Sequence, residues 1–182
     1  MATYWASTNS QPKRAHRFLF KFGNVTGQDE GKLPAWVCSR VTRPSMEITT
    51  TEAQYMNHTF KYPGRVKWNN ISVTLRDPVD PDASVVLYEW LDKCGYKPPI
   101  DAPSTKKALT SFTKKSFADF FGALLIQSLN GEGDVVEEWG IYNPIITSVN
   151  WGEFDYSSED LINITVDIAY DYATIKKVAS AA

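Results

Sequence analysis

The side chains that could carry out catalysis are few, and their spacing does not suit it. The chain has two histidines, His16 and His58, and neither has the i, i+4 partner on a helix that zinc metalloproteases use. Glu137 and Glu138 are adjacent on an expected strand, so they point to opposite faces and cannot act together as an acid/base pair. No Ser, Thr or Cys lies in a nucleophile elbow. The sequence therefore predicts a protein that is not an enzyme.

Metal and cofactor sites are no better supported. Asp77, Asp80 and Asp82 are spaced like the start of a calcium loop, but two prolines interrupt them and the glycine and late glutamate of an EF-hand are missing. Helix capping and turn formation explain all three aspartates. Cys38 and Cys94 are far apart and form no CxxC motif, so we expect two reduced, buried thiols. We expect no cofactor and no bound metal.

Composition sets further limits on function. The 182 residues carry a formal net charge of −2, with 43% hydrophobic and 13% aromatic residues. Proteins that grip nucleic acid usually have a basic surplus, which is missing here. The polar N-terminus has no apolar signal segment and no stretch is long enough to span a membrane, so we expect synthesis in a cytoplasm without membrane insertion. A loose basic cluster is expected to be a solvated face or, as an alternative, a partner contact; it comprises Lys106, Lys107, Lys114 and Lys115.

The first half of the chain reads mainly as strands. Alternation predicts strands over residues 16–22 and 65–76, with a bulge at Asn69-Asn70 where the apolar phase changes. A shorter apolar piece covers residues 35–41 and is stopped by Pro44. Residues 46–62 are rich in Thr and Tyr and suit a long, shallowly buried hairpin, with Pro63-Gly64 as a turn. We expect this hairpin to pack on a neighbouring subunit through Glu47, Thr49, Thr51, Tyr55, Met56 and His58.

One helix is expected after this region. Asp80-Pro81 would supply its N-cap and first residue, Leu87, Trp90 and Cys94 share one face, and Gly95 would follow its end. A second helix within 110–121 is left open, because its phenylalanines have helical spacing while Thr, Ser and Phe are indifferent helix formers.

The C-terminal part contains a hairpin and the clearest strand. Residues 123–129 and 135–142 flank a Gly-rich turn. Residues 162–172 then alternate, which predicts one strand with an apolar face and a small, polar, acidic face. That polar face comprises Asn163, Thr165, Asp167, Ala169 and Asp171, and it could equally be the ordinary solvent face of an antiparallel sheet.

Together these elements predict a mainly β fold, an antiparallel β sandwich or barrel with one or two flanking α-helices. We expect a polar N-terminal arm over residues 1–15 and a single β domain over residues 16–182.

The order of these elements resembles the tail tube proteins of contractile-tailed bacteriophages, which are related in fold to the type VI secretion tube protein. The resemblance spans about residues 16–175 and rests on HRFLF (16–20), CSRVTRPSME (38–47), WNNISVTL (68–75), YEW (88–90), EWGIYNP (138–144) and VDIAYDY (166–172). The region 97–115 matches least well.

The resemblance implies a structural function in a virion tail. Six subunits would form a ring, and stacked rings would form a hollow tube with a continuous β barrel as its inner wall. The hairpin would reach toward the next ring, and the polar face of the last strand would line the lumen, where an acidic wall lets DNA pass without specific binding. The implied partners are the tail sheath, the tape-measure protein and the baseplate and neck proteins, after synthesis in the host bacterial cytoplasm.

Two other functions stay open at this point. A tube initiator or terminator would share the same fold but would not polymerise into long tubes. A small-ligand-binding β barrel would be a monomer. Images of the purified protein would separate the three, because long tubes, single rings and monomers look different.

Overall fold

The structure is a computed structural model that describes residues 12–23, 33–98 and 111–178. Within these ranges most of the chain is extended. The strands are β1 (Phe18–Lys21), β2 (Cys38–Val41), β3 (Ser45–Tyr55), β4 (His58–Asn69), β5 (Ile71–Arg76), β6 (Ala123–Leu129), β7 (Val135–Tyr142), β8 (Ile145–Asn150), β9 (Asn163–Ala169) and β10 (Tyr172–Lys177). Two α-helices, α1 (Ala83–Lys93) and α2 (Lys114–Phe121), and a single 3₁₀ turn, η2 (Ala35–Val37), complete the described elements.

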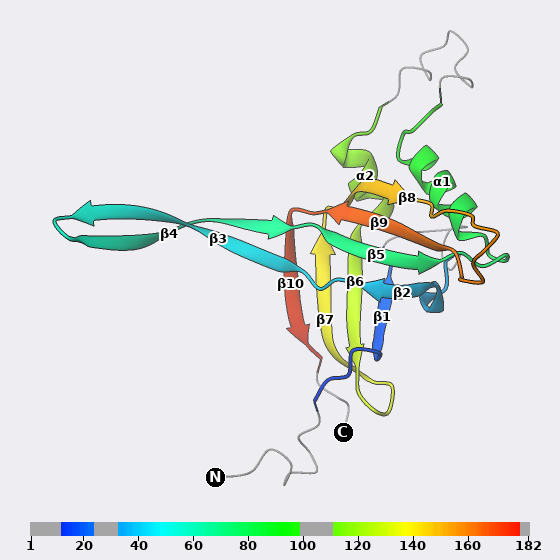
Figure 1. The fold of residues 1–182 in the computed structure, drawn as a ribbon, viewed down its shortest axis with the longest axis horizontal. Coiled ribbons are helices and arrows are strands. Elements are labelled where there is room, and N and C mark those ends of the chain that lie inside the picture. Colours follow the sequence, from blue (N-terminus) through cyan, green and yellow to red (C-terminus); the bar gives the residue numbers. More distant parts are fainter. Residues whose placement is uncertain (1–11, 24–32, 99–110, 179–182) are drawn as a thin grey trace.

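The strands form two four-stranded antiparallel sheets and a separate hairpin. Sheet A has the order β1-β6-β7-β10, and sheet B has the order β2-β5-β9-β8. Figure 1 shows the strands of sheet A crossing those of sheet B, with the two helices grouped at one end of the sheets. This arrangement confirms the predicted mainly β fold with two flanking helices.

The core lies between the two sheets and under the helices. Alternate residues of β5 and β9 point into it, so Val73 and Val166 are fully buried and paired in register. Trp90 of α1 packs edge-on against the rings of Phe22 and Phe121. Burial of these large apolar groups is the main stabilising contribution, at about 25 cal/mol per Å² removed from water.

Capping explains where the two helices begin. The Asp82 carboxylate accepts a hydrogen bond from the backbone N–H of Val85, 2.9 Å away, so α1 starts two residues later than expected from Asp80-Pro81. Asp77 also accepts from the backbone N–H of Ala83. Thr113 and Ser116 form a reciprocal capping box, which gives α2 a defined start despite its indifferent helix formers.

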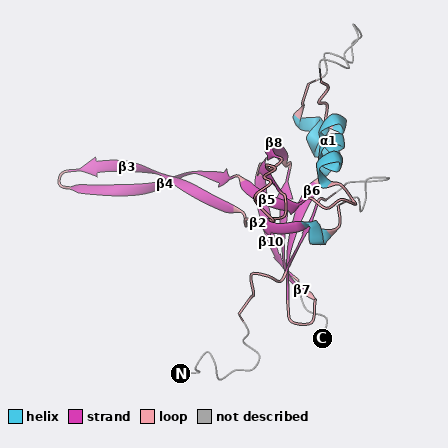
Figure 2. Ribbon diagram, turned by 45° about the vertical axis from the view of Figure 1, so that its right-hand side comes forward, coloured by secondary structure: helices cyan, strands magenta, loops and turns pink. Residues whose placement is uncertain are grey.

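The hairpin β3–β4 continues the β2–β5 pair of sheet B beyond the body of the molecule. β2 pairs with β5, and the chain between them runs out along β3 and returns along β4. Figures 1 and 2 show this hairpin as a long arm that projects from the sheets without another element beside it. The arm is therefore a separate two-stranded sheet that is attached to sheet B through residues 42–44 and Asn70.

Three local expectations were wrong. Pro63-Gly64 is not a turn, because both residues lie within β4, where the register shifts between Ile48 and Thr50 of the opposite strand. The phase change at Asn69-Asn70 marks the passage from β4 to β5 rather than a bulge. The last strand ends at Ala169 and not at residue 172, because the chain turns there from sheet B into sheet A. The division at residues 15 and 16 stays a prediction.

Candidate assembly surfaces

The hairpin exposes almost all of its side chains. Every residue of β3 is exposed, and so is every residue of β4 up to Lys67. Its large apolar side chains are at least half exposed, and they are Met46, Ile48, Tyr55, Met56, Phe60, Tyr62 and Val66. A two-stranded hairpin is at best marginally stable in water, and a surface this apolar is typical of one that another molecule covers.

The apolar side of the hairpin changes face along its length. Near the body, the cross-strand pairs Met46–Trp68 and Ile48–Val66 share one face. Beyond the bulge, the pairs Thr51–Tyr62, Ala53–Phe60 and Tyr55–His58 share the opposite face. The bulge lies between these two halves, where Thr49 Oγ1 accepts from the Arg65 N–H at 2.9 Å. The arm thus presents apolar surface in opposite directions.

Five of the six hairpin residues predicted from the sequence lie on one face, because Glu47, Thr49, Thr51 and Tyr55 alternate along β3 and His58 is opposite Tyr55. Glu47, beside the body, accepts a hydrogen bond from the Asn69 side chain at 3.1 Å and lies across from Lys67. Thr49 lies at the bulge, while Thr51, Tyr55 and His58 lie on the distal apolar face. Met56 forms the turn with a positive φ of 52° and is 84% exposed. Sequence reasoning missed Phe60 and Tyr62, which cross-strand pairing with residues 53 and 51 brings to the same face.

The outer face of sheet B has small polar side chains at its centre, with Arg40 of β2 opposite Thr74 and Arg76 of β5 opposite Asn163. Thr165 and Asp167 of β9 are opposite Thr74 and Ser72 of β5, and all four point away from the core. Ser148 of β8 lies on the other side of Asp167. Asn163 and Ala169 belong to the same face of β9. The predicted hydrophilic surface therefore extends over three strands.

Asp171 lies apart from this face, in the turn between β9 and β10. Its carboxylate accepts hydrogen bonds from Lys114 Nζ at 2.6 Å and from Asn143 Nδ2 at 2.7 Å. These bonds, Lys114 first, hold the pKa of Asp171 below its ordinary value. The contact also ties α2 to the turn. Lys114, expected in a solvated basic cluster, is thus paired, Lys115 is exposed, and Lys106 and Lys107 lie outside the described residues.

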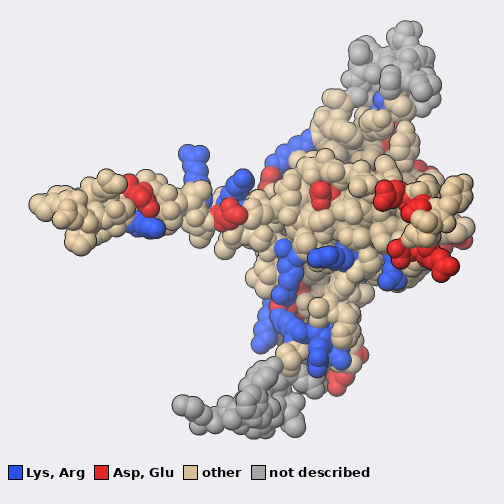
Figure 3. All heavy atoms as spheres, viewed as in Figure 1, with Lys and Arg blue, Asp and Glu red and all other residues tan. Residues whose placement is uncertain are grey.

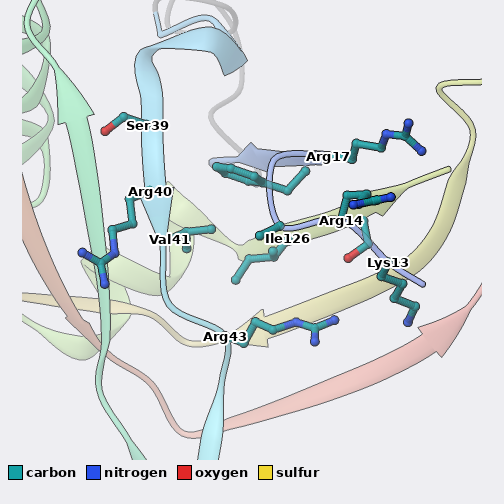
Figure 4. A pocket seen from close by; sticks show the side chains of 11 residues that line it. Lys13, Arg14, Arg17, Ser39, Arg40, Val41, Arg43 and Ile126 are labelled. Carbon is teal, nitrogen blue, oxygen red and sulfur yellow. The ribbon is translucent and has the colours of Figure 1, made fainter. Parts of the chain in front are cut away.

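A basic cavity that sequence reasoning missed lies between β1, β2 and β6. It has a volume of about 460 Å³ and five cationic residues around it: Lys13, Arg14, Arg17, Arg40 and Arg43. Phe18, Val41 and Ile126 supply apolar lining. Figure 4 shows Lys13, Arg14, Arg17 and Arg43 on one side of β2 and Arg40 on the other. The cations come from two segments that are distant in sequence and meet only in the fold.

One carboxylate lies beside this cavity. Glu137 of β7 is buried and forms ion pairs with Arg43 and Lys13. It also accepts a hydrogen bond from Trp139 Nε1 at 2.7 Å. Within the described residues, Arg14, Arg17 and Arg40 have no carboxylate within 4.0 Å. The cavity therefore keeps a surplus of positive charge.

An acidic segment connects β8 to β9. Residues 151–162 carry four carboxylates and no Lys or Arg, and the carboxylates are Glu153, Asp155, Glu159 and Asp160. Asp155 accepts from the backbone N–H and hydroxyl of Ser157, and these bonds keep the pKa of Asp155 below its ordinary value. Phe154 is 93% exposed between two of these acids. Figure 3 shows acidic atoms gathered at the end of the molecule opposite the hairpin.

The residues considered for catalysis lie apart. His16 is exposed in the turn before β1, and His58 is exposed next to the hairpin tip. Cys38 and Cys94 are buried and unpaired, and burial raises the pKa of each thiol to about 12. Over the described ranges no three His, Cys, Asp or Glu side chains are grouped as a metal site would need. In the same part of the chain, no helix has the length and apolar character to cross a membrane.

Comparison with known proteins gives one family and a set of solved structures. A comparison with curated protein sequences finds no match. The fold is similar to the anti-feeding prophage cap, described as a tube terminating cap, with a TM-score of 0.65, 19% identity and coverage of 98% of this chain and 100% of the other. It is equally similar to a chain of the sheath-tube complex of the extracellular contractile injection system PVC in its extended state (TM-score 0.65, 17% identity, coverage of 98% and 99%).

The family model agrees with the fold, the projecting hairpin and the sequence resemblance. The model of the T4-like virus tail tube protein gp19 matches residues 14–174, which include every described strand except the last residues of β10. The chain therefore belongs to the T4-like virus tail tube protein gp19 family.

Proposed function

We propose that this chain is the repeating subunit of a tail tube, with six copies in a ring and rings stacked inside a contractile sheath. The hairpin is the observation that carries the proposal. It extends away from the body as a separate two-stranded sheet and leaves seven large apolar side chains at least half exposed. A neighbouring subunit would cover these side chains, and their burial would favour assembly.

The edges of the sheets support closure into a ring. Sheet A ends at β1 and β10, and in the described part of the chain each of these strands pairs on one side only. Unpaired strand edges are prone to pair with another chain, and a closed barrel removes them. Edge pairing between neighbours in the ring would therefore satisfy backbone groups that the isolated subunit leaves to water.

For the channel wall we propose the outer face of β9, with Asn163, Thr165, Asp167 and Ala169. Neighbouring strands place Ser72, Thr74 and Ser148 on the same surface, so the wall would be hydrophilic, with small side chains around Asp167. Arg40, opposite Thr74, and Arg76, opposite Asn163, also belong to this face. The carboxylate of Asp171 would add little net negative charge to the wall, because the ammonium group of Lys114 pairs with it.

The partners follow from this function and remain part of the proposal. They are the tail sheath, the tape-measure protein and the baseplate and neck proteins, and DNA would pass without specific binding. We propose no catalytic activity for the chain. In this proposal every described surface serves assembly or passage.

A tube terminator or initiator is the second candidate. The specific observation in its favour is that the tube terminating cap matches the fold as well as the tube chain of the injection system does, with a TM-score of 0.65 in both cases. A terminator would form rings but would not extend them.

Electron microscopy of the purified chain tests both candidates. We expect long tubes for a tube subunit, whereas single rings would favour the terminator. Replacing Tyr55 and Met56 with Asp should leave a folded subunit that no longer stacks, because the charges would fall on the distal apolar face and the exposed tip. The control Gln54→Asp with Thr59→Asp places two charges on the opposite, polar face and should still form tubes. A wild-type chain that remains a monomer at high concentration would contradict the proposal.

A further inference from the structure

The basic cavity has the features of a peptide-binding site. Its floor contains Phe18, Val41 and Ile126, and its cations lie around these apolar groups. Figure 4 shows Val41 and Ile126 between Arg40 on one side and Arg17, Arg14 and Lys13 on the other. An apolar floor with a cationic rim fits a segment that carries an apolar side chain between carboxylates.

The acidic segment has this composition. Phe154 lies between Glu153 and Asp155 and is 93% exposed. Glu159 and Asp160 add two further negative charges a few residues later. Gly152, with a positive φ of 81° and a neighbouring Asn163 carbonyl oxygen, sets the direction in which the segment leaves the sheet. Its exposed phenylalanine and its charges both complement the cavity.

One chain does not bring these two surfaces together. The cavity lies between β1, β2 and β6, whereas the segment joins β8 and β9, and no ion pair or hydrogen bond connects them within the described residues. Figure 3 shows basic and acidic atoms gathered on different parts of the molecule. Contact between them therefore needs a second copy, with different surfaces of the two copies meeting.

We propose that residues 152–160 of one copy bind in the basic cavity of a neighbouring copy, with Phe154 against the apolar floor and the carboxylates against Arg14 and Arg17. The inference rests on the proposed tube function and names an inter-subunit contact distinct from the hairpin. Each copy would use its cavity for one neighbour and its segment for another. Such a contact repeats from copy to copy without being self-complementary.

Charge reversal on each side tests the contact. The cavity variant carries Arg14→Glu and Arg17→Glu, and the segment variant carries Glu153→Lys and Glu159→Lys. Glu153 and Glu159 are chosen because neither has a recorded ion pair, whereas Asp155 and Asp160 hold turns of the segment. We expect each variant to raise the critical concentration for assembly at least about ten-fold, measured by sedimentation and checked by electron microscopy.

Mixing the two variants shows whether they fail to assemble because the contact is lost or because the chains are misfolded. In a mixture, the reversed cavity of one variant meets the reversed segment of the other, and the unaltered cavity meets the unaltered segment. Assembly should therefore return to near the wild-type critical concentration, and the chain with all four substitutions should behave in the same way. The matched controls Lys115→Glu and Asp119→Lys reverse exposed charges on α2 and should assemble like the wild type.

The outcomes distinguish this inference from the proposed function. If the wild type forms tubes and either reversal variant assembles at the wild-type concentration, the cavity–segment contact is wrong and the tube function stands. Failure of the mixture to assemble also overturns the contact. A wild-type chain that stays monomeric overturns both. A zero-length carbodiimide cross-link from Lys13 to Glu153 or Glu159, formed between isotopically light and heavy copies, is the direct positive result.

Discussion

Glu137 shows how one buried charge can organise a surface. It is 7% exposed, receives hydrogen bonds from Arg43 and Trp139, and also pairs with Lys13. Its partners come from the N-terminal segment, from the connection between β2 and β3, and from β7 itself. The carboxylate therefore ties the base of the hairpin to sheet A, and it holds two of the cations at the basic cavity.

Replacing Glu137 with Gln should destabilise the subunit. The amide can still accept from Trp139, but it removes the charge that Arg43 and Lys13 contact, so we expect the free energy of unfolding to fall by about 1–3 kcal/mol. Urea denaturation followed by tryptophan fluorescence measures this loss. The control Glu138→Gln alters a partly exposed carboxylate whose recorded partner is Gln127 and should change stability by less than about 0.5 kcal/mol. Equal effects of the two substitutions would show that the buried pairing contributes nothing special.

Asp171 should make a small, pH-dependent contribution to stability. Its pKa is lower in the folded chain than its ordinary value of 3.8, so its pairing with Lys114 stabilises the fold above that value. The contribution should disappear as the pH falls from about 3.8 through the lower folded pKa. Because the group is largely exposed, we expect well under about 1 kcal/mol. Asp171→Asn should thus differ from the wild type at neutral pH and converge with it in acid; a constant difference down to pH 2 would contradict this.

At the scale of elements, the sequence predicted most strands because one face of each is buried. Alternation located β1, β5 and β9, an apolar run and a Gly-rich turn located β6 and β7, and capping residues located α1. Two boundaries failed for local reasons. Pro63-Gly64 are turn residues by type, but the same residues suit a bulge, and the pairing of β3 with β4 decides between them. Polar residues also continue at alternate positions through Tyr170-Asp171, although the chain turns there. Alternation alone therefore did not show where β9 ends.

The candidate surfaces were predictable only in part. The exposed hairpin follows from a composition too polar for a core, and the polar face of β9 follows from its alternation. The basic cavity does not, because Lys13, Arg14 and Arg17 are far in sequence from Arg40 and Arg43. Only the packing of β1 and β2 beside each other brings these cations together. The sequence pattern of either segment does not predict that packing.

The two apolar half-faces of the hairpin should each be needed for assembly. We expect Ile48→Asp, near the body, and Phe60→Asp, beyond the bulge, to block tube growth separately, because each places a charge in an apolar contact. Thr50→Asp and Gln54→Lys lie on the polar side of the distal half, opposite uncharged residues, and should have little effect. Monomer stability should stay within about 0.5 kcal/mol of the wild type in all four variants, since all these positions are exposed. If only one half-face matters, the arm has a single covered side.

The whole molecule is long, with its arm and its acidic segment at opposite ends. Figure 1 shows the hairpin extending from one side of the sheets and the connection between β8 and β9 on the other. A subunit shaped in this way offers different surfaces to the copies around it. Such an arrangement suits repeated assembly, in which each added copy presents the same pair of surfaces to the next.

The proposed channel wall predicts a charge effect on DNA passage. Asp167→Lys would change the wall by two units per subunit, or about 12 per ring of six, so phosphates would be retained and ejection would slow most strongly at low salt. Tubes should still assemble, because Asp167 lies on the outer face of sheet B. Ejection rates and infectivity at graded salt measure the effect, with Asp119→Lys on α2 as the control. Normal infectivity of the Asp167→Lys phage would place this face away from the channel.

The two buried thiols have a practical consequence. Cys38 and Cys94 are the only cysteines in the chain, and with pKa values of about 12 only about one in 10⁵ is a thiolate at pH 7. The native surface is therefore nearly inert to maleimides and other alkylating reagents. A single cysteine introduced at Asp167 or at Lys115, which is exposed on α2, would be the one reactive thiol on each subunit. An assembled tube would then carry dyes, spin labels or catalysts at the spacing of its own lattice, inside or outside according to the position chosen.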